Sequence, residues 1–185
     1  DKRFDAMGEM ASEAPAGANG VMFNPCLAGG SSFDKSQNIR GSLFNLSLGS
    51  TRSDIARAVF EGIAMHLRLA SAALEKSGRL GDRLLVVGGG SKGEFNRRIY
   101  ADVFGKTVAV SRVRQDAASL GAAALAAVGC GVWDSFEPLR EMHRDQANCL
   151  PNAENHGYYD RVMPVYKKMC DACSDLGDLM INVKR

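Results

Sequence analysis

The sequence has little net charge, no long apolar run and few cysteines. Its net charge of +2 gives no reason to expect binding to nucleic acid or to an anionic membrane. The longest apolar run, residues 120–133, is too short to span a bilayer, and the polar start around Asp1 and Asp5 does not resemble a signal peptide. These absences predict a protein that contacts neither nucleic acid nor membrane.

The five cysteines form an odd and scattered set. Such a set argues against a disulfide framework and predicts a reducing, cytoplasmic location. Cys170 and Cys173 form the one Cys-x-x-Cys pair, in a helical C-terminal pattern with no second pair and no histidine at ligand spacing. We therefore expect two ordinary helix residues there, and the sequence predicts no metal ligand.

The chain of 185 residues has the composition of one globular domain or two small lobes, with 45% hydrophobic and 24% charged residues. Short apolar strands alternate with helical patterns. Strands are expected near 21–23, 41–46, 84–87 and 107–110, and helices within 1–19 and near 52–77, 91–104, 117–128, 136–144 and 158–183. This alternation indicates an α/β domain with a largely parallel central portion.

Capping patterns predict where three helices begin. Thr51 and Asp54 form a variant of the capping box at the start of the longest apolar-periodic segment. Ser91 and Glu94 form a Ser-x-x-Glu box, which predicts that the next helix begins at Ser91. Asp116 is the expected N-cap of the following helix, whose small residues permit close packing against a sheet.

The most informative stretch is residues 84–95, where an apolar strand runs into a glycine-rich turn that opens a helix. Backbone that approaches a phosphate or ribose closely favours glycine, because a Cβ would block the approach. The exposed N–H groups at a helix start favour an anion, and ligands of α/β sheets lie beyond the carboxyl ends of strands. The turn is therefore a candidate nucleotide site, with Gly88, Gly89, Gly90, Ser91 and Gly93.

The turn alone allows several interpretations. A phosphate-binding P-loop fails, because Glu94-Phe95 stands where Lys-Ser/Thr is required. Residues 88–93 satisfy Gly-x-Gly-x-x-Gly, and Arg112 after the next strand could hold the 2′-phosphate of NADP. An NADP-binding oxidoreductase domain is thus one alternative, in which Arg112→Ala weakens NADPH much more than NADH. A non-catalytic interaction module that binds no nucleotide is the other.

Ordered sequence blocks run through nearly the whole chain. They are GVMFNP at 20–25, LAG at 27–29, GSLFNL at 41–46, RAVFEGIA at 57–64, GGGS at 88–91, ADVFG at 101–105, LGAA at 120–123 and GVW at 131–133. In this order and spacing they resemble the C-terminal domain of carbohydrate kinases of the FGGY family. The tail with Tyr158, Tyr159, Arg161 and Tyr166 resembles the closing helix of xylulose-kinase-type members.

The resemblance implies an actin-like (ribonuclease H-like) ATPase domain, with a mixed central sheet flanked by helices. In this family two such domains enclose ATP and a sugar or polyol, commonly a ketose such as xylulose, and ATP phosphorylates a hydroxyl of it. Gly89 and Gly90 resemble turn positions that lie against the nucleotide, and Ser91 in the same turn is expected to cap the helix first. Gly93 stands where relatives often carry an Asn that contacts the nucleoside, and because glycine lacks that side chain, this contact is left open. A contact between Lys92 and a phosphate is left open as well.

The resemblance also implies what residues 1–185 do not supply. The family's catalytic Asp, its Mg²⁺-linked phosphate loop and most sugar contacts belong to the N-terminal domain, and none is recognisable in this sequence. We therefore expect a C-terminal half that packs against an N-terminal kinase domain and is inactive alone; a homodimer is left open. Residues 29–33 also depart from the Gly-Glu-Arg-x-Pro that many relatives carry, which bears on the subfamily.

Three other ionisable residues have simpler interpretations than catalysis. Glu61, between Phe60 and Gly62, is expected to be a buried and hydrogen-bonded structural carboxylate. Asp102 is expected to be a helix residue of its block, and His66 to lie on a helix face without a ligand.

Overall fold

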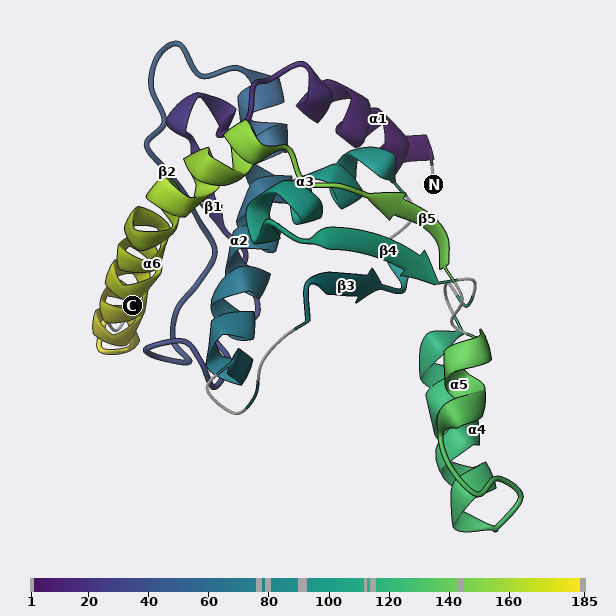
Figure 1. Cartoon of the computed structure of the whole chain (residues 1–185). Helices are drawn as coiled ribbons and strands as arrows, with labels where there is room; N and C mark the ends of the chain where they lie inside the picture. Colours follow the sequence, from purple (N-terminus) through teal and green to yellow (C-terminus); the bar gives the residue numbers. More distant parts are fainter. Residues whose placement is uncertain are drawn as a thin grey trace.

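The structure, a computed structural model, describes residues 2–75, 78, 81–89, 93–111, 113, 116–142 and 145–183. The chain order of its elements is followed by colour in Figure 1. They are α1 (Lys2–Ser12), the 3₁₀ helix η1 (Ala18–Gly20), β1 (Met22–Asn24), β2 (Ser42–Phe44), α2 (Arg52–Glu75), β3 (Arg83–Val86), α3 (Glu94–Phe104), β4 (Thr107–Ser111), α4 (Ala117–Gly129), α5 (Glu137–Met142), β5 (Asp145–Cys149) and α6 (Ala153–Ile181).

The strands form two small sheets. β1 and β2 pair antiparallel, with Phe23 opposite Leu43. The second sheet has the order β3-β4-β5, in which β3 and β4 run parallel with Leu85 opposite Ala109, and β5 runs antiparallel to β4. The parallel pair joined by α3 is the unit that the strand–helix alternation predicts. The sheet is otherwise mixed, because β5, which the sequence did not predict, adds an antiparallel edge.

The main core lies among α1, α2, α3 and α6 (Figure 1). Phe60 of α2 is central to this core. Its ring meets the rings of Phe4 and Phe95 edge-on, with 5.5 Å between ring centroids in each pair. Such edge-to-face pairs add to the free energy gained by burying the rings. Tyr159 and Tyr166 of α6 are also fully buried, so the last helix is part of the core.

The start of α2 confirms the predicted capping pair. Thr51 Oγ1 accepts a hydrogen bond from the backbone N–H of Asp54 at 3.1 Å, and Asp54 Oδ2 accepts one from the backbone N–H of Thr51 at 2.8 Å. Asn19 Nδ2 donates to Asp54 Oδ1 at 2.8 Å, which links η1 to the helix start. The bonds from Thr51, with that from Asn19, stabilise the ionised carboxylate and lower the pKa of Asp54 from 3.8.

We expect Asp54→Asn to destabilise the chain at neutral pH and to matter less in acid. A carboxyl group with a lowered folded-state pKa contributes stability in full above the unfolded-state value, near 3.8, and loses it as the pH falls through the lower folded-state value. Urea unfolding of the wild type and the variant at neutral pH, at about pH 5 and at about pH 3 measures this contribution. A difference in unfolding free energy that is the same at all three would contradict the prediction.

Of the two other predicted helix starts, that of α3 is wrong and that of α4 is confirmed. α3 begins at Glu94, with Gly93 as an extended N-cap residue that makes no side-chain cap bond. Glu94 is thus the first helical residue and pairs with Arg98 at 2.6 Å, so the prediction of a helix start at Ser91 is wrong. Asp116 stands at the N-cap position of α4, but its side chain makes no cap hydrogen bond.

The predicted packing of α4 against a sheet is also wrong. In Figure 1, α4 and α5 extend away from both sheets as an arm. Ala124 is the buried residue of α4, whereas Leu125 is 66% exposed and Phe136, before α5, is 47% exposed. The small residues of α4 permit close packing, but in the described part of the chain α4 lies against neither sheet.

α6 begins five residues before the predicted start at Tyr158, because Asn152 caps it by accepting a hydrogen bond from the backbone N–H of Asn155 at 3.0 Å. α5 begins at Glu137, one residue after its predicted start, and its predicted end at residue 144 lies outside the described residues. Within the described ranges, no helix has both the length and the apolarity to cross a membrane.

Candidate functional site

The glycine-rich turn lies between the carboxyl end of β3 and the start of α3 (Figure 1). Gly88 has a φ of +80°, a conformation that residues with a Cβ rarely adopt. Among the described residues, a Cβ added at Gly88 or Gly89 would meet nothing within 4 Å, and one at Gly93 would meet only Asn96 Cβ at 3.9 Å. Glycine is thus required by the backbone at Gly88, whereas packing does not require it at Gly89 or Gly93. Open space beside an exposed backbone is what a closely approaching ligand needs.

Of the predicted site, the structure describes Gly88 and Gly89 after β3 and Gly93 at the N-cap of α3. Gly90 and Ser91 lie outside the described residues, as do Lys92 and Arg112. The predicted nucleotide contacts of these four residues therefore stay predictions.

A hollow of about 280 Å³ lies beside Gly93, between α1 and the first turn of α3. Phe4, Gly8, Phe60 and Phe95 contribute to its wall, so an apolar surface adjoins the turn. Ligand pockets usually measure about 300–1,000 Å³. The volume of the hollow is therefore enough for part of a ligand, and another surface has to cover the rest of that ligand.

Glu61 is the centre of a buried hydrogen-bond network. Its Oε1 accepts from Arg57 Nε at 2.6 Å, from the Tyr159 hydroxyl at 2.8 Å and from the backbone N–H of Gly17 at 3.0 Å. Burial raises the pKa of Glu61, and the three donors oppose that shift. The network joins α2 to α6 and to the loop before η1, which confirms the interpretation of Glu61 as a structural carboxylate.

Asp102 is a second structural carboxylate. Its Oδ1 accepts from the backbone N–H of Asn152 at 2.7 Å, and its Oδ2 accepts from Asn155 Nδ2 at 2.8 Å. These bonds tie α3 to the start of α6, so both oxygens are used in holding the fold.

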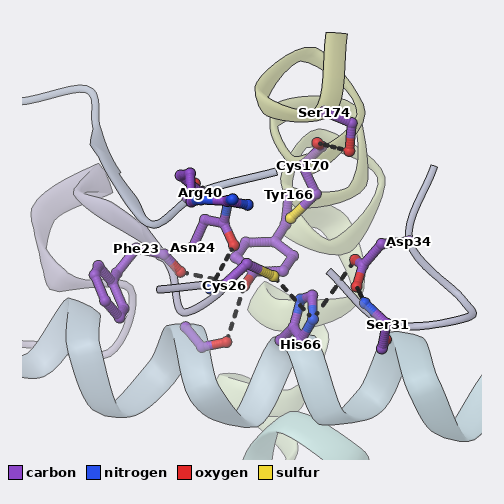
Figure 2. A network of polar contacts seen from close by, with 11 residues as sticks. Phe23, Asn24, Cys26, Ser31, Asp34, Arg40, His66, Tyr166, Cys170 and Ser174 are labelled. Carbon is purple, nitrogen blue, oxygen red and sulfur yellow. Dashed lines mark hydrogen bonds and ion pairs between the residues drawn. The ribbon is translucent and has the colours of Figure 1, made fainter. Parts of the chain in front are cut away.

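Sequence reasoning missed a third polar cluster, which Figure 2 shows. His66 of α2 has its Nε2 3.4 Å from Cys26 Sγ and 3.6 Å from Asp34 Oδ1. Cys26 follows β1, and Asp34 lies in the long loop that leads to β2. The three residues are far apart in the chain and share no motif spacing, so only the fold brings them together.

Comparisons with a family profile and with individual relatives indicate the same family. Residues 1–130 match the profile of the "FGGY family of carbohydrate kinases, C-terminal domain". A xylulose kinase of Staphylococcus epidermidis is 33% identical over 169 residues, which cover 90% of this chain and 34% of that protein. An autoinducer-2 kinase of Salmonella paratyphi A is 35% identical over 165 residues, which cover 86% of this chain and 30% of that protein.

A solved structure agrees with the sequence relatives. The crystal structure of ligand-bound xylulose kinase from Lactobacillus acidophilus matches 90% of this chain and 34% of its own, with a TM-score of 0.80 and 26% identity. The predicted α/β fold of the actin-like ATPase type is thereby confirmed. The chain spans about a third of the length of the curated relatives described above. It belongs to the FGGY family of carbohydrate kinases.

Proposed function

We propose that this chain is the nucleotide-side domain of an ATP-dependent sugar kinase and supplies the adenosine half of its site. The observation that carries the proposal is the glycine turn after β3, where Gly88 and Gly89 leave open space against the backbone. The apolar hollow beside Gly93 supports it, because an aromatic base favours an apolar wall. A ketose such as xylulose is the proposed substrate, since a 33% identical relative is a xylulose kinase.

The remaining catalytic parts are proposed to come from an N-terminal domain that packs against this chain. Phosphoryl transfer needs positioned phosphates, a metal ion and an oriented nucleophile. Glu61 and Asp102 are engaged in holding the fold, so neither is a candidate base. Exposed apolar side chains such as Leu67 of α2 and Leu125 of α4 support a covering domain. The chain alone is expected to be inactive.

Magnesium is proposed to reach the full-length site with ATP and to be held mainly by the other domain. Mg²⁺ prefers oxygen ligands in octahedral geometry. Within the described ranges, the one group of three close metal-ligating side chains is Cys26, Asp34 and His66, whose thiol and imidazole do not suit Mg²⁺. No magnesium ligand is therefore assigned in this chain. The five cysteines, all of them described, are free thiols, which supports a reducing, cytoplasmic location.

The test is ligand-observed NMR on this chain with ATP, NADPH and D-xylulose in separate samples. We expect saturation transfer to the adenine and ribose protons of ATP, and its loss in Gly89→Val, because the added methyl groups fill the open space beside the turn. Gly81→Val is the matched control, since Gly81 also has open space around it but precedes β3.

Each outcome of this experiment separates the alternatives. Equal transfer from ATP in the wild type and in Gly89→Val would contradict a site at the turn. Transfer to the nicotinamide of NADPH would favour the oxidoreductase alternative, and silence from all three compounds would contradict a half-site that forms without the other domain.

A further inference from the structure

Cys26, Asp34 and His66 form a buried cluster on other elements than the glycine turn (Figure 2). The Sγ, one carboxylate oxygen and one ring nitrogen all lie within 4.8 Å of one another. The side chains of His66 and Asp34 are 13% and 4% exposed, and Cys26 is buried. A thiol, a carboxylate and an imidazole that converge in a buried place are three good ligands for a transition metal.

Two of the three separations between ligand atoms are close to those that a tetrahedral zinc ion imposes. Zinc binds sulfur at about 2.3 Å, imidazole nitrogen at about 2.0–2.1 Å and carboxylate oxygen at about 2.0–2.2 Å, which separates sulfur from nitrogen by about 3.5 Å and nitrogen from oxygen by about 3.4 Å. Here Cys26 Sγ and His66 Nε2 are 3.4 Å apart, and His66 Nε2 and Asp34 Oδ1 are 3.6 Å apart. Small side-chain shifts therefore complete three corners of the tetrahedron.

Neighbouring groups hold two of the ligands in place. Asp34 Oδ2 accepts from the backbone N–H of Ser31 at 2.7 Å and from its hydroxyl at 3.0 Å, which leaves Oδ1 toward His66. Asn24 Oδ1 accepts from the backbone N–H of Cys26 at 3.1 Å and fixes the turn that carries the thiol. Partners of this kind orient metal ligands in known sites.

The imidazole of His66 makes its polar contacts only on the side of the cluster. Its Nδ1 is buried and has no hydrogen-bond partner among the described residues. His66 directs Nε2 toward both a thiol and a carboxylate, and without a metal the one nitrogen cannot satisfy both fully.

We propose that Cys26, Asp34 and His66 bind one Zn²⁺ ion, with water as the fourth ligand. The mixed sulfur, nitrogen and oxygen set suits zinc better than the hard ions Mg²⁺ and Ca²⁺. A hollow of about 300 Å³ adjoins the cluster at Asp34, which lines it together with Phe33. On binding, the Cys26 thiol loses its proton to solvent and its sulfur forms the bond to zinc. The ion would join the loop between β1 and β2 to α2.

The test uses this chain after removal of metals with a chelator. Titration with Zn²⁺ against a chromophoric chelator is expected to show one equivalent bound, and Co²⁺ in its place is expected to give a thiolate-to-cobalt charge-transfer band. Cys26→Ser is expected to abolish the band, and His66→Gln to weaken zinc binding beyond the about 10–100-fold that loss of a supporting partner costs. Cys130→Ser, at an exposed thiol, is the control and should bind as the wild type does.

Two further variants keep the result interpretable. Cys173→Ser tests an alternative thiol, whose Sγ lies 3.1 Å from Ser42 Oγ; loss of the band there would show that Cys26 is not the ligand. Asp34→Asn replaces His66→Gln if circular dichroism shows that the latter is unfolded. Absence of stoichiometric zinc, or wild-type affinity in Cys26→Ser, would overturn the proposal. None of these measurements involves ATP, so the outcome is independent of the proposed kinase function.

Discussion

Alanine at Gly62 is expected to destabilise the chain by about 3 kcal/mol, whereas alanine at Gly121 is expected to stabilise it by about 0.5–1 kcal/mol. Both glycines lie inside helices, α2 and α4. A Cβ at Gly62 would come within 2.1 Å of the Phe23 carbonyl oxygen and 2.9 Å of its carbonyl carbon. These are backbone atoms of β1, so no side-chain rotation relieves the overlap and α2 has to move away from the strand.

Gly121 is a matched control because its added Cβ would meet nothing within 4 Å. There the substitution changes only helix propensity, which favours alanine over glycine. Urea unfolding of the two variants, followed by far-ultraviolet circular dichroism, measures both effects. Equal and small changes at the two positions would show that α2 does not lie on β1 as closely as the structure has it.

Helix α2 shows why apolar periodicity predicts the presence of a helix better than it predicts which side of the helix is buried. Apolar residues of α2 recur at helical spacing, and the helix forms where that spacing predicts it. Ile63 and Leu67 of this series are nevertheless 37% and 48% exposed, while Arg57 and Glu61 are buried. Periodicity indicates a helix but does not show which face the chain covers. Here the covered face carries small and polar residues beside Phe60, because Gly62 allows close contact with β1 and the charged pair is hydrogen-bonded.

A capping pattern in the sequence predicted the helix start correctly only where its two residues make the hydrogen bonds that the pattern implies. Thr51 and Asp54 are three residues apart and make the predicted bonds, since both partners belong to the same helix start. The prediction at Ser91 failed because the backbone is still extended at Gly93, which places Glu94 at the first helical position, two positions before the one that closes a capping box. Strand β5 was missed because its residues, 145–149, are mostly polar and carry no apolar alternation.

The fold class was predictable because ordered sequence blocks along the chain resemble one family. The candidate zinc cluster was not, since Cys26 and Asp34 come from the loop between β1 and β2 and His66 from α2, with no characteristic spacing. The glycine turn was predictable in part. Its residues predicted a ligand site, and the structure adds that the space beside Gly88 and Gly89 is open.

Removing the Glu61 carboxylate is expected to lower the free energy of unfolding strongly. Glu61→Ala is expected to cost about 3–5 kcal/mol, because it leaves the buried Arg57 guanidinium without its counter-charge. It also removes the acceptor of the Tyr159 hydroxyl and of the Gly17 N–H. Asp171→Ala, which breaks the exposed pair with Lys167 at the same four-residue spacing, is expected to change stability by less than about 1 kcal/mol.

A double-mutant cycle identifies the cause of the loss at Glu61. If the unpaired charge of Arg57 dominates, then Arg57→Ala should cost far less in the Glu61→Ala background than in the wild type. Arg57 also donates from Nη1 to the Ala14 carbonyl at 2.7 Å and lies 5.5 Å from the centre of the Phe95 ring, so some cost remains in either background. Urea unfolding of the wild type, both single variants and the double variant measures the coupling. Strict additivity would mean that the two side chains stabilise the fold separately, and that Glu61 acts through Tyr159 and Gly17 rather than through its ion pair.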